Sequence, residues 1–119
     1  MGLRRLRAAK DENAAKLAAD VVSYATGVGV NEMLEGPRGS AEAAFARQLA
    51  MYLCHVAFEL SLARVAQAFE RDRSTVAHAC HSIEDKRDDE SFDSWVASLE
   101  AMLRDAPAPG APSRWAEAS

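Results

Sequence analysis

A chain of 119 residues, of which 49% are apolar, has room for one compact domain and little more. It contains no apolar run of about 18 residues and no charged-then-apolar leader, so we expect a cytoplasmic protein. The formal net charge of −4 argues weakly against nucleic-acid binding. However, residues 1–16 are mainly basic and residues 84–105 mainly acidic. Because binding needs basic groups on one face only, the net charge does not exclude a nucleic-acid-binding protein.

The first helix is predicted over residues 13–25, where apolar residues recur at three- and four-residue spacing. Residues 1–12 are expected to form a basic arm before it. Two glycines end the helix, and Asn31 is a candidate cap for one short turn after them. A loop rich in glycine and proline then carries Arg38.

The longest helix is predicted over residues 41–59, with Ser40 as its N-cap. Alanine and leucine residues trace its buried stripe. Arg47, Gln48 and Tyr52 fall beside that stripe, where a partner could meet them.

Two shorter helices follow in close succession. Ser61 is the expected N-cap of the first, which ends at Phe69, and Asp72 is the expected N-cap of the second. The acids from Asp85 to Asp93 are expected to form a solvated connector.

A last amphipathic helix is predicted behind Ser91, and its apolar residues continue to Leu103. Residues 105–119, rich in alanine and proline, are expected to be a disordered tail in which Trp115 is either unstructured or a docking residue. The predicted fold class is all-α, a compact bundle of about five or six helices that contains a helix-turn-helix.

The segment 61–86 has the organisation of a helix-turn-helix, in which the first turn of the second helix faces base edges in the major groove. Arg73, Ser74 and Thr75 occupy that turn. Arginine can bond both acceptors of guanine, and a threonine methyl group can contact the methyl group of thymine. His78 lies further along the exposed face, within reach of a base or a phosphate. Spacing alone is weak evidence, because many helical proteins contain two capped short helices.

Two stretches add specificity. Residues 47–53 read Arg-Gln-Leu-Ala-Met-Tyr-Leu and residues 71–80 read Arg-Asp-Arg-Ser-Thr-Val-Ala-His-Ala-Cys, with Ser61-Leu62 and Phe69 between them. Together they resemble the C-terminal DNA-binding domain of the bacterial replication initiator DnaA. The signature of that family is Arg-Gln-x-Ala-Met-Tyr-Leu, Ser-Leu and Gly-Arg-Asp-His-Thr-Thr-Val-x-His-Ala. Weaker similarity extends from about residue 16 to 103, so we expect a DnaA-like domain over residues 13–104.

The resemblance implies a helical domain whose long helix packs behind the helix-turn-helix, and whose partner is double-stranded DNA. By position, Arg47 and Gln48 would hold the DNA backbone. In the family a basic residue before the long helix enters the minor groove, and Arg38 is the candidate here, one residue out of register. The expected DNA-binding set is Arg38, Arg47, Gln48, Arg71, Arg73, Ser74, Thr75, Val76 and His78.

Three departures from the family are informative. The turn after Phe69 is one residue shorter and lacks the family's glycine, Arg73 replaces a histidine, and Ser74 replaces a threonine. The last two changes fall where bases are read, so we predict a different or relaxed target, with a guanine opposite Arg73. The sequence also has no Gly-x-x-x-x-Gly-Lys-Ser/Thr phosphate loop, so we expect a reading domain that neither binds a nucleotide nor carries the initiator's ATPase.

The sequence shows no activated nucleophile, no paired acids and no cofactor loop, so we expect neither an enzyme nor a cofactor. A metal site formed by His78, Cys80, His81 and Cys54 is an alternative, but the spacing matches no recognised zinc pattern. The basic arm is either a solvated terminus or an additional DNA contact.

The leading hypothesis is a sequence-specific double-stranded DNA-binding protein of the bacterial nucleoid that regulates transcription. One alternative is a replication modulator that competes for initiator-type sites. Another is a protein-interaction module that retains the fold without DNA binding, which the net charge of −4 favours. Pairing of subunits, as a homodimer or as cooperative neighbours, stays open because one helix-turn-helix reads few base pairs.

Overall fold

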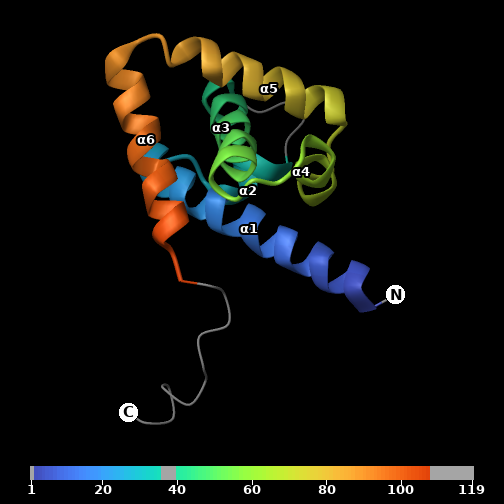
Figure 1. Cartoon of the computed structure of the whole chain (residues 1–119). Coiled ribbons are helices and arrows are strands. Elements are labelled where there is room, and N and C mark those ends of the chain that lie inside the picture. The colour runs from blue at the N-terminus through green and yellow to red at the C-terminus, as the bar shows by residue number, and fades with distance from the viewer. Residues whose placement is uncertain (1, 36–39, 108–119) are drawn as a thin grey trace.

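The computed structural model describes residues 2–35 and 40–107, and over these ranges the chain forms six helices and no strand. The predicted all-α class is confirmed. Figure 1 shows α3 in the centre, with α5 above it, α1 beneath it, and α4 and α6 at opposite ends. The helices are α1 (Gly2–Thr26), α2 (Val30–Glu35), α3 (Ala41–Ala57), α4 (Leu62–Phe69), α5 (Arg73–Lys86) and α6 (Glu90–Asp105).

α1 and α3 pack closely because their buried faces consist largely of alanine. Ala18 and Ala19 of α1 and Ala43, Ala46 and Ala50 of α3 are completely buried. Small side chains let two helices approach, and larger apolar side chains fill the space around the contact. The core therefore surrounds α3, which separates α1 from α5.

α1 begins at Gly2, so the predicted start of the first helix at residue 13 is wrong, and residues 2–12 are helical rather than a separate arm. These residues are mostly alanine, leucine, arginine and lysine, which propagate a helix even without a complete apolar stripe. Asp11 lies in this stretch and is only 7% exposed. Arg64 of α4 donates to both of its carboxylate oxygens, at 3.0 and 2.7 Å. This forked ion pair joins α1 to α4.

The predicted caps of α3 and α4 are confirmed. The hydroxyl group of Ser40 accepts a hydrogen bond from the Ala43 amide, and that of Ser61 accepts one from the Arg64 amide. Asp72 occupies the N-cap position of α5, but its side chain makes no capping hydrogen bond. The first amides of α5 therefore have no bond from that side chain.

Two other predicted caps are wrong. α6 is capped by Asp89, whose carboxylate accepts a hydrogen bond from the Phe92 amide, so Ser91 lies inside the helix. α2 begins at Val30, which places Asn31 inside that helix as well. In both cases the chain becomes helical earlier than the apolar spacing indicated.

A polar network around Arg87 holds the corner between α5 and α6. The guanidinium group donates to the Tyr52 hydroxyl at 3.0 Å, to Glu100 at 2.7 Å, and to Asp93. The Tyr52 hydroxyl in turn donates to Glu84 at 2.6 Å. Burial, followed by the bond to Glu84, raises the pKa of Tyr52 to about 12, so the phenol keeps its proton at neutral pH.

This network corrects two expectations from the sequence. Tyr52 is 2% exposed, so it packs in the interior rather than facing a partner. The acids between Asp85 and Asp93 are not simply a solvated connector, because the carboxylate of Asp93 is paired with Arg87.

Both cysteines carry free thiols. Burial raises the pKa of Cys54 to about 12 and that of Cys80 to about 11. Across residues 2–35 and 40–107, no group of three or more histidine, cysteine, aspartate or glutamate side chains could hold a metal ion. None of the described helices combines the length and the hydropathy needed to cross a membrane.

Candidate nucleic-acid interface

A short turn from Glu70 to Asp72 joins α4 to α5. Glu70 adopts the left-handed conformation, with φ 55° and ψ 48°, and the Arg71 amide donates to the Ala66 carbonyl at 2.9 Å. This backbone conformation favours glycine and costs any other residue about 1–2 kcal/mol. The turn thus keeps a shape typical of glycine although the sequence has glutamate there.

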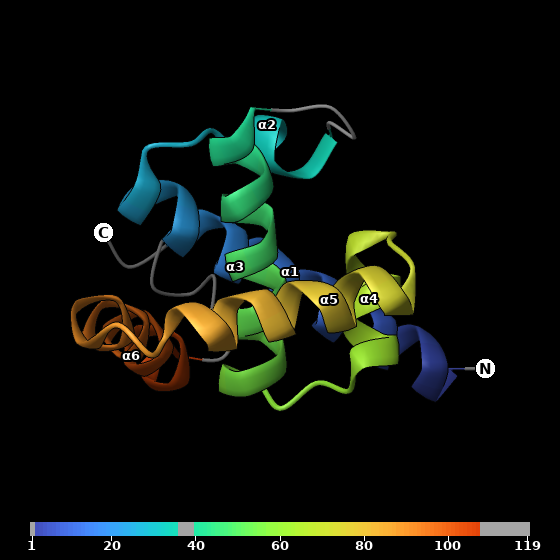
Figure 2. The ribbon, with the colours of Figure 1, turned by 90° about the horizontal axis from the view of Figure 1, so that it is seen from above.

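The apolar faces of α4 and α5 point into the core and orient the two helices. Val65 and Phe69 are buried on α4, and Val76, Ala79 and Ile83 are buried on α5. The opposite side of α5 is left to the solvent. Figure 2 shows α5 crossing in front of α3, with none of the described helices over its outer face.

The beginning of α5 is open. Arg73, Ser74 and Thr75 are all exposed, and His78 is exposed about one turn further along. The N-terminus of a helix presents unpaired amides and partial positive charge, both of which favour a phosphate group. The structure thus brings four of the predicted DNA-binding side chains to one accessible end of one helix.

Val76 is wrong as a predicted DNA contact, because its side chain is completely buried. Successive residues of a helix are separated by about 100°, so a residue between two exposed positions can face inward. Val76 shares the inner face with Ala79 and Ile83. Its contribution is to fix α5 against the core.

Arg47 and Arg71 come together at the C-terminal end of α2. Arg47 donates to the Met33 carbonyl at 3.2 Å, and Arg71 donates to the Leu34 carbonyl at 3.1 Å. Carbonyl groups at a helix C-terminus carry partial negative charge, so both cations stabilise α2 there. Burial, and then the positive charge of Arg71, lower the pKa of Arg47. Both side chains remain partly exposed, and they form a paired cationic patch near the start of α5.

The remaining predicted residues are less well placed. Gln48 follows Arg47 on α3 and is partly exposed. Arg38 lies outside the described residues. The contacts of Arg47 and Arg71 with α2 span 14 and 37 positions of the chain, so no local pattern in the sequence could have indicated them.

Charge is distributed unequally along α5. Arg73 lies at its start, next to the exposed N-cap residue Asp72, whereas Glu84, Asp85 and Lys86 are exposed at its end. His81 is 3.5 Å from Asp85, one turn away on the same exposed surface. Charges of both signs therefore lie at each end of α5, and the attraction of a polyanion to its first turn depends on Arg73, the neighbouring Arg71 and the partial positive charge of the helix N-terminus.

The short helix, the tight turn and the second helix with an open polar start define a helix-turn-helix domain. Residues 16–83 match the family model described as the bacterial DnaA protein helix-turn-helix, and the chain belongs to that family.

Individual relatives agree with this assignment. The chain is 39% identical over 72 residues to the chromosomal replication initiator protein DnaA of Mycobacteroides abscessus, in a match that covers 58% of this chain and 15% of that protein. A DNA replication initiation factor superposes with a TM-score of 0.76 at 32% identity, covering 87% of this chain and 32% of that one. DnaA bound to AMPPCP and single-stranded DNA superposes with a TM-score of 0.73 at 31% identity, covering 87% and 31%. The chain thus spans a small part of the initiators that it resembles.

Proposed function

We propose that this protein binds double-stranded DNA sequence-specifically through the first turns of α5 and regulates transcription at the bacterial nucleoid. The single observation that carries the proposal is the division of α5 into a buried face and an exposed one. Val76, Ala79 and Ile83 hold the helix in place, while the polar residues of its first turns lie uncovered. A helix presented in this way fits the major groove.

The exposed residues have different roles. Arg73 reads a base, because a guanidinium group can bond both acceptors of a guanine in the major groove. Ser74, Thr75 and His78 contact bases or phosphates beside it. Arg47, Gln48 and Arg71 face the DNA backbone, where the two arginines contribute affinity that does not depend on sequence. No catalytic step is part of this function.

Selection of bound duplexes from a random library tests the proposal. We expect one enriched motif, whose symmetry reports whether two subunits bind together. Affinity should fall steeply as salt rises, because binding releases counterions from the DNA phosphates and this release becomes less favourable at higher salt concentration. The control variant Lys16→Ala should leave DNA affinity nearly unchanged, since it removes one exposed positive charge from α1, away from α5. No duplex binding even at low salt would leave the fold as a protein-interaction module and refute the proposal.

A second candidate function is replication control by occupation of initiator-type sites. The 39% identity to the M. abscessus initiator favours it. Arg73 and Ser74 weigh against it, because they differ from the family's signature at positions that face bases. Mapping of bound sites in cells separates the candidates, because replication control predicts enrichment at the origin and transcription control predicts enrichment at promoters.

A further inference from the structure

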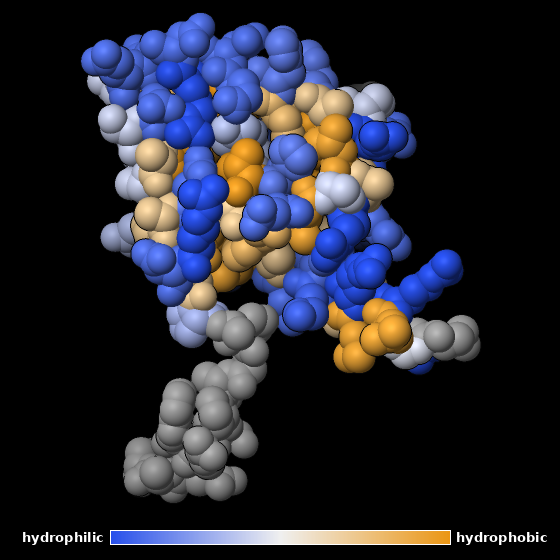
Figure 3. Space-filling model, in the orientation of Figure 1, coloured by the Kyte–Doolittle hydropathy of each residue, from blue (hydrophilic) through white to orange (hydrophobic). Residues whose placement is uncertain are grey.

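An apolar groove lies away from α5, between α1, the end of α3 and α6. It encloses about 1140 Å³. Figure 3 shows apolar surface in the middle of this face, bordered by hydrophilic residues, and a second apolar cluster at the free end of α1. Leu3 and Leu6, near that end, are 84% and 63% exposed. Monomeric proteins seldom leave large apolar side chains so open in one place without a partner.

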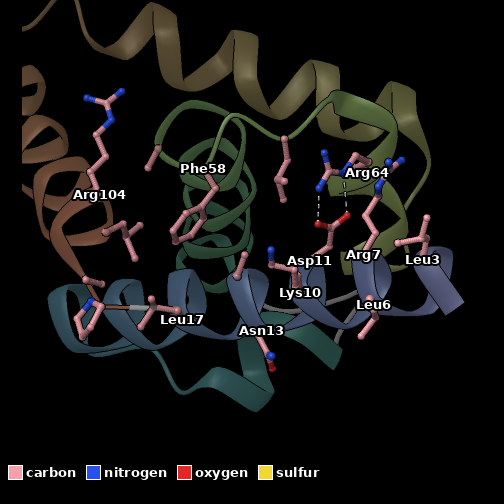
Figure 4. A pocket seen from close by; sticks show the side chains of 16 residues that line it. Leu3, Leu6, Arg7, Lys10, Asp11, Asn13, Leu17, Phe58, Arg64 and Arg104 are labelled. Carbon is pink, nitrogen blue, oxygen red and sulfur yellow. Dashed lines mark hydrogen bonds and ion pairs between the residues drawn. The ribbon is translucent and has the colours of Figure 1, made fainter. Parts of the chain in front are cut away.

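Cations surround the apolar floor. Figure 4 shows Phe58 between Arg104 on one side and Arg7 and Lys10 on the other. Arg64 is a fourth lining cation, and Asp11 is the one carboxylate among the described lining residues. Asp11 is paired with Arg64 at 2.7 Å, and Arg104 is paired with Glu100 of its own helix at 3.1 Å, so Arg7 and Lys10 are the lining cations that neither acid neutralises. The α1 side of the groove is therefore positive, at Arg7 and Lys10, within a chain whose net charge is −4.

The shape of the groove selects a class of occupant. Its volume is slightly above the roughly 300–1000 Å³ of pockets for drug-sized ligands, and its lining comes from helices and from the segments that follow α3 and α6, with no strand edge to extend. A concave wall of this kind accepts the apolar face of a helix, whereas a lipid surface is flat on this scale.

Charge argues against a second copy of α1 as the occupant. α1 carries five basic residues, Arg4, Arg5, Arg7, Lys10 and Lys16, against three acidic ones, Asp11, Glu12 and Asp20. Insertion of α1 from a second copy would bring like charges together. An acidic helix would instead meet opposite charge along α1, at Arg7 and Lys10.

We propose that this groove binds an amphipathic helix of a partner protein, with its apolar face on Leu17 and Phe58 and an acidic flank beside Arg7 and Lys10. Among the described residues, none of those that line the groove belongs to α5. The partner and DNA can therefore be bound at once, and the inference does not depend on the proposed function.

Two synthetic helical peptides of about five turns test this proposal with the full chain. Both carry the same leucine stripe, but one has glutamate flanks and the other lysine flanks. Fluorescence anisotropy should show at least about tenfold tighter binding of the glutamate peptide. The double charge reversal Arg7→Glu with Lys10→Glu should abolish that preference. Equal affinity for the two peptides, or no binding of either, overturns the proposal.

Matched single substitutions locate the binding. Leu6→Asp should weaken binding of the glutamate peptide at least about tenfold, because it places a carboxylate in the apolar contact. Tyr24→Asp is the control, since Tyr24 lies on the same helix, is 86% exposed, and is outside the groove. An equal effect of the two substitutions contradicts the proposed site.

Two further measurements test whether the groove instead binds a second copy of the chain or a membrane. Sedimentation equilibrium of the wild type and of Leu6→Asp detects self-association through the groove, and a dimer lost in Leu6→Asp would assign the groove to a second copy. Flotation with phosphatidylglycerol vesicles detects lipid binding, and vesicle binding without peptide binding would assign it to a membrane. Either result overturns the proposal, whereas a monomer that binds the peptide and not the vesicles supports it.

Discussion

The outer face of α5 and the groove beside α1 are both exposed, but they differ in chemistry. The first is convex and polar, with charged residues of both signs at each end of the helix. The second is concave and apolar, with positive charge along α1 at Arg7 and Lys10. A polar helix end suits a hydrated, charged polymer, and an apolar hollow suits a folded segment of protein. The comparison teaches that exposure alone does not define a site, because the kind of surface decides what can bind.

The largest expected effect contrasts the two sides of α5 itself. Val76→Asp places a charge in the core, which should cost more than about 4 kcal/mol and leave the chain unfolded by circular dichroism. Thr75→Asp, one residue earlier on the exposed side, should leave the melting temperature nearly unchanged and abolish duplex binding by repulsion of phosphate. If Thr75→Asp also unfolds the chain, the division of α5 into two faces is wrong.

The next effect concerns the groove side. Asp11→Ala removes the partner of Arg64 and should lower the free energy of unfolding by about 2 kcal/mol, less than for a fully buried pair because the Arg64 side chain is 38% exposed. Urea denaturation measures this, and Asp20→Ala, at an exposed position of the same helix, should change stability by less than about 0.5 kcal/mol. At urea concentrations below the unfolding transition, Asp11→Ala should bind DNA with the affinity of the wild type. A loss of DNA binding in the folded variant would show that the two faces are coupled.

Arg73→Ala is expected to cost about 1–3 kcal/mol of DNA binding and to relax the preference at one base pair. Replacing the guanine at that position by 7-deazaguanine removes one acceptor, so it should weaken the wild type and have no further effect on the variant. Arg47→Ala should weaken binding to all duplexes alike. Equal and sequence-independent losses from both substitutions would contradict the assigned roles.

The smallest effect is at the turn. Glu70→Gly should stabilise the fold by up to about 1 kcal/mol, because glycine relieves the left-handed backbone but loses more entropy on folding. Gln67→Gly, at an exposed position inside α4, should instead destabilise by about 1 kcal/mol. Thermal unfolding of the two variants distinguishes them. Destabilisation by both would mean that Glu70 is not strained.

Local patterns were sufficient for much of the interface. The succession of two short capped helices predicted the helix-turn-helix, and hydroxyl side chains identified the caps at Ser40 and Ser61. Val76 was misassigned because the resemblance treats adjacent residues of a motif together, although a helix places them on different sides. The family has a glycine in this turn, and glycine is typical of left-handed backbone. The left-handed conformation at Glu70 could therefore have been expected from the resemblance.

Contacts between distant positions could not be predicted. Asp11 and Arg64 are 53 positions apart, and Arg87 joins residues of α3 and α6. Neither set of contacts produces a periodic pattern in the sequence. The groove was missed for the same reason, since its walls come from separate helices and the start of α1 seemed only a basic arm.

Amide NMR of the labelled chain, titrated with a selected duplex, tests the central claim most directly. Perturbations should concentrate at residues 71–78, with weaker ones around residue 47, while the amides of α1 beside the groove stay unchanged. Perturbations centred on α1 and α6, or the same perturbations with an unselected duplex, would contradict the account.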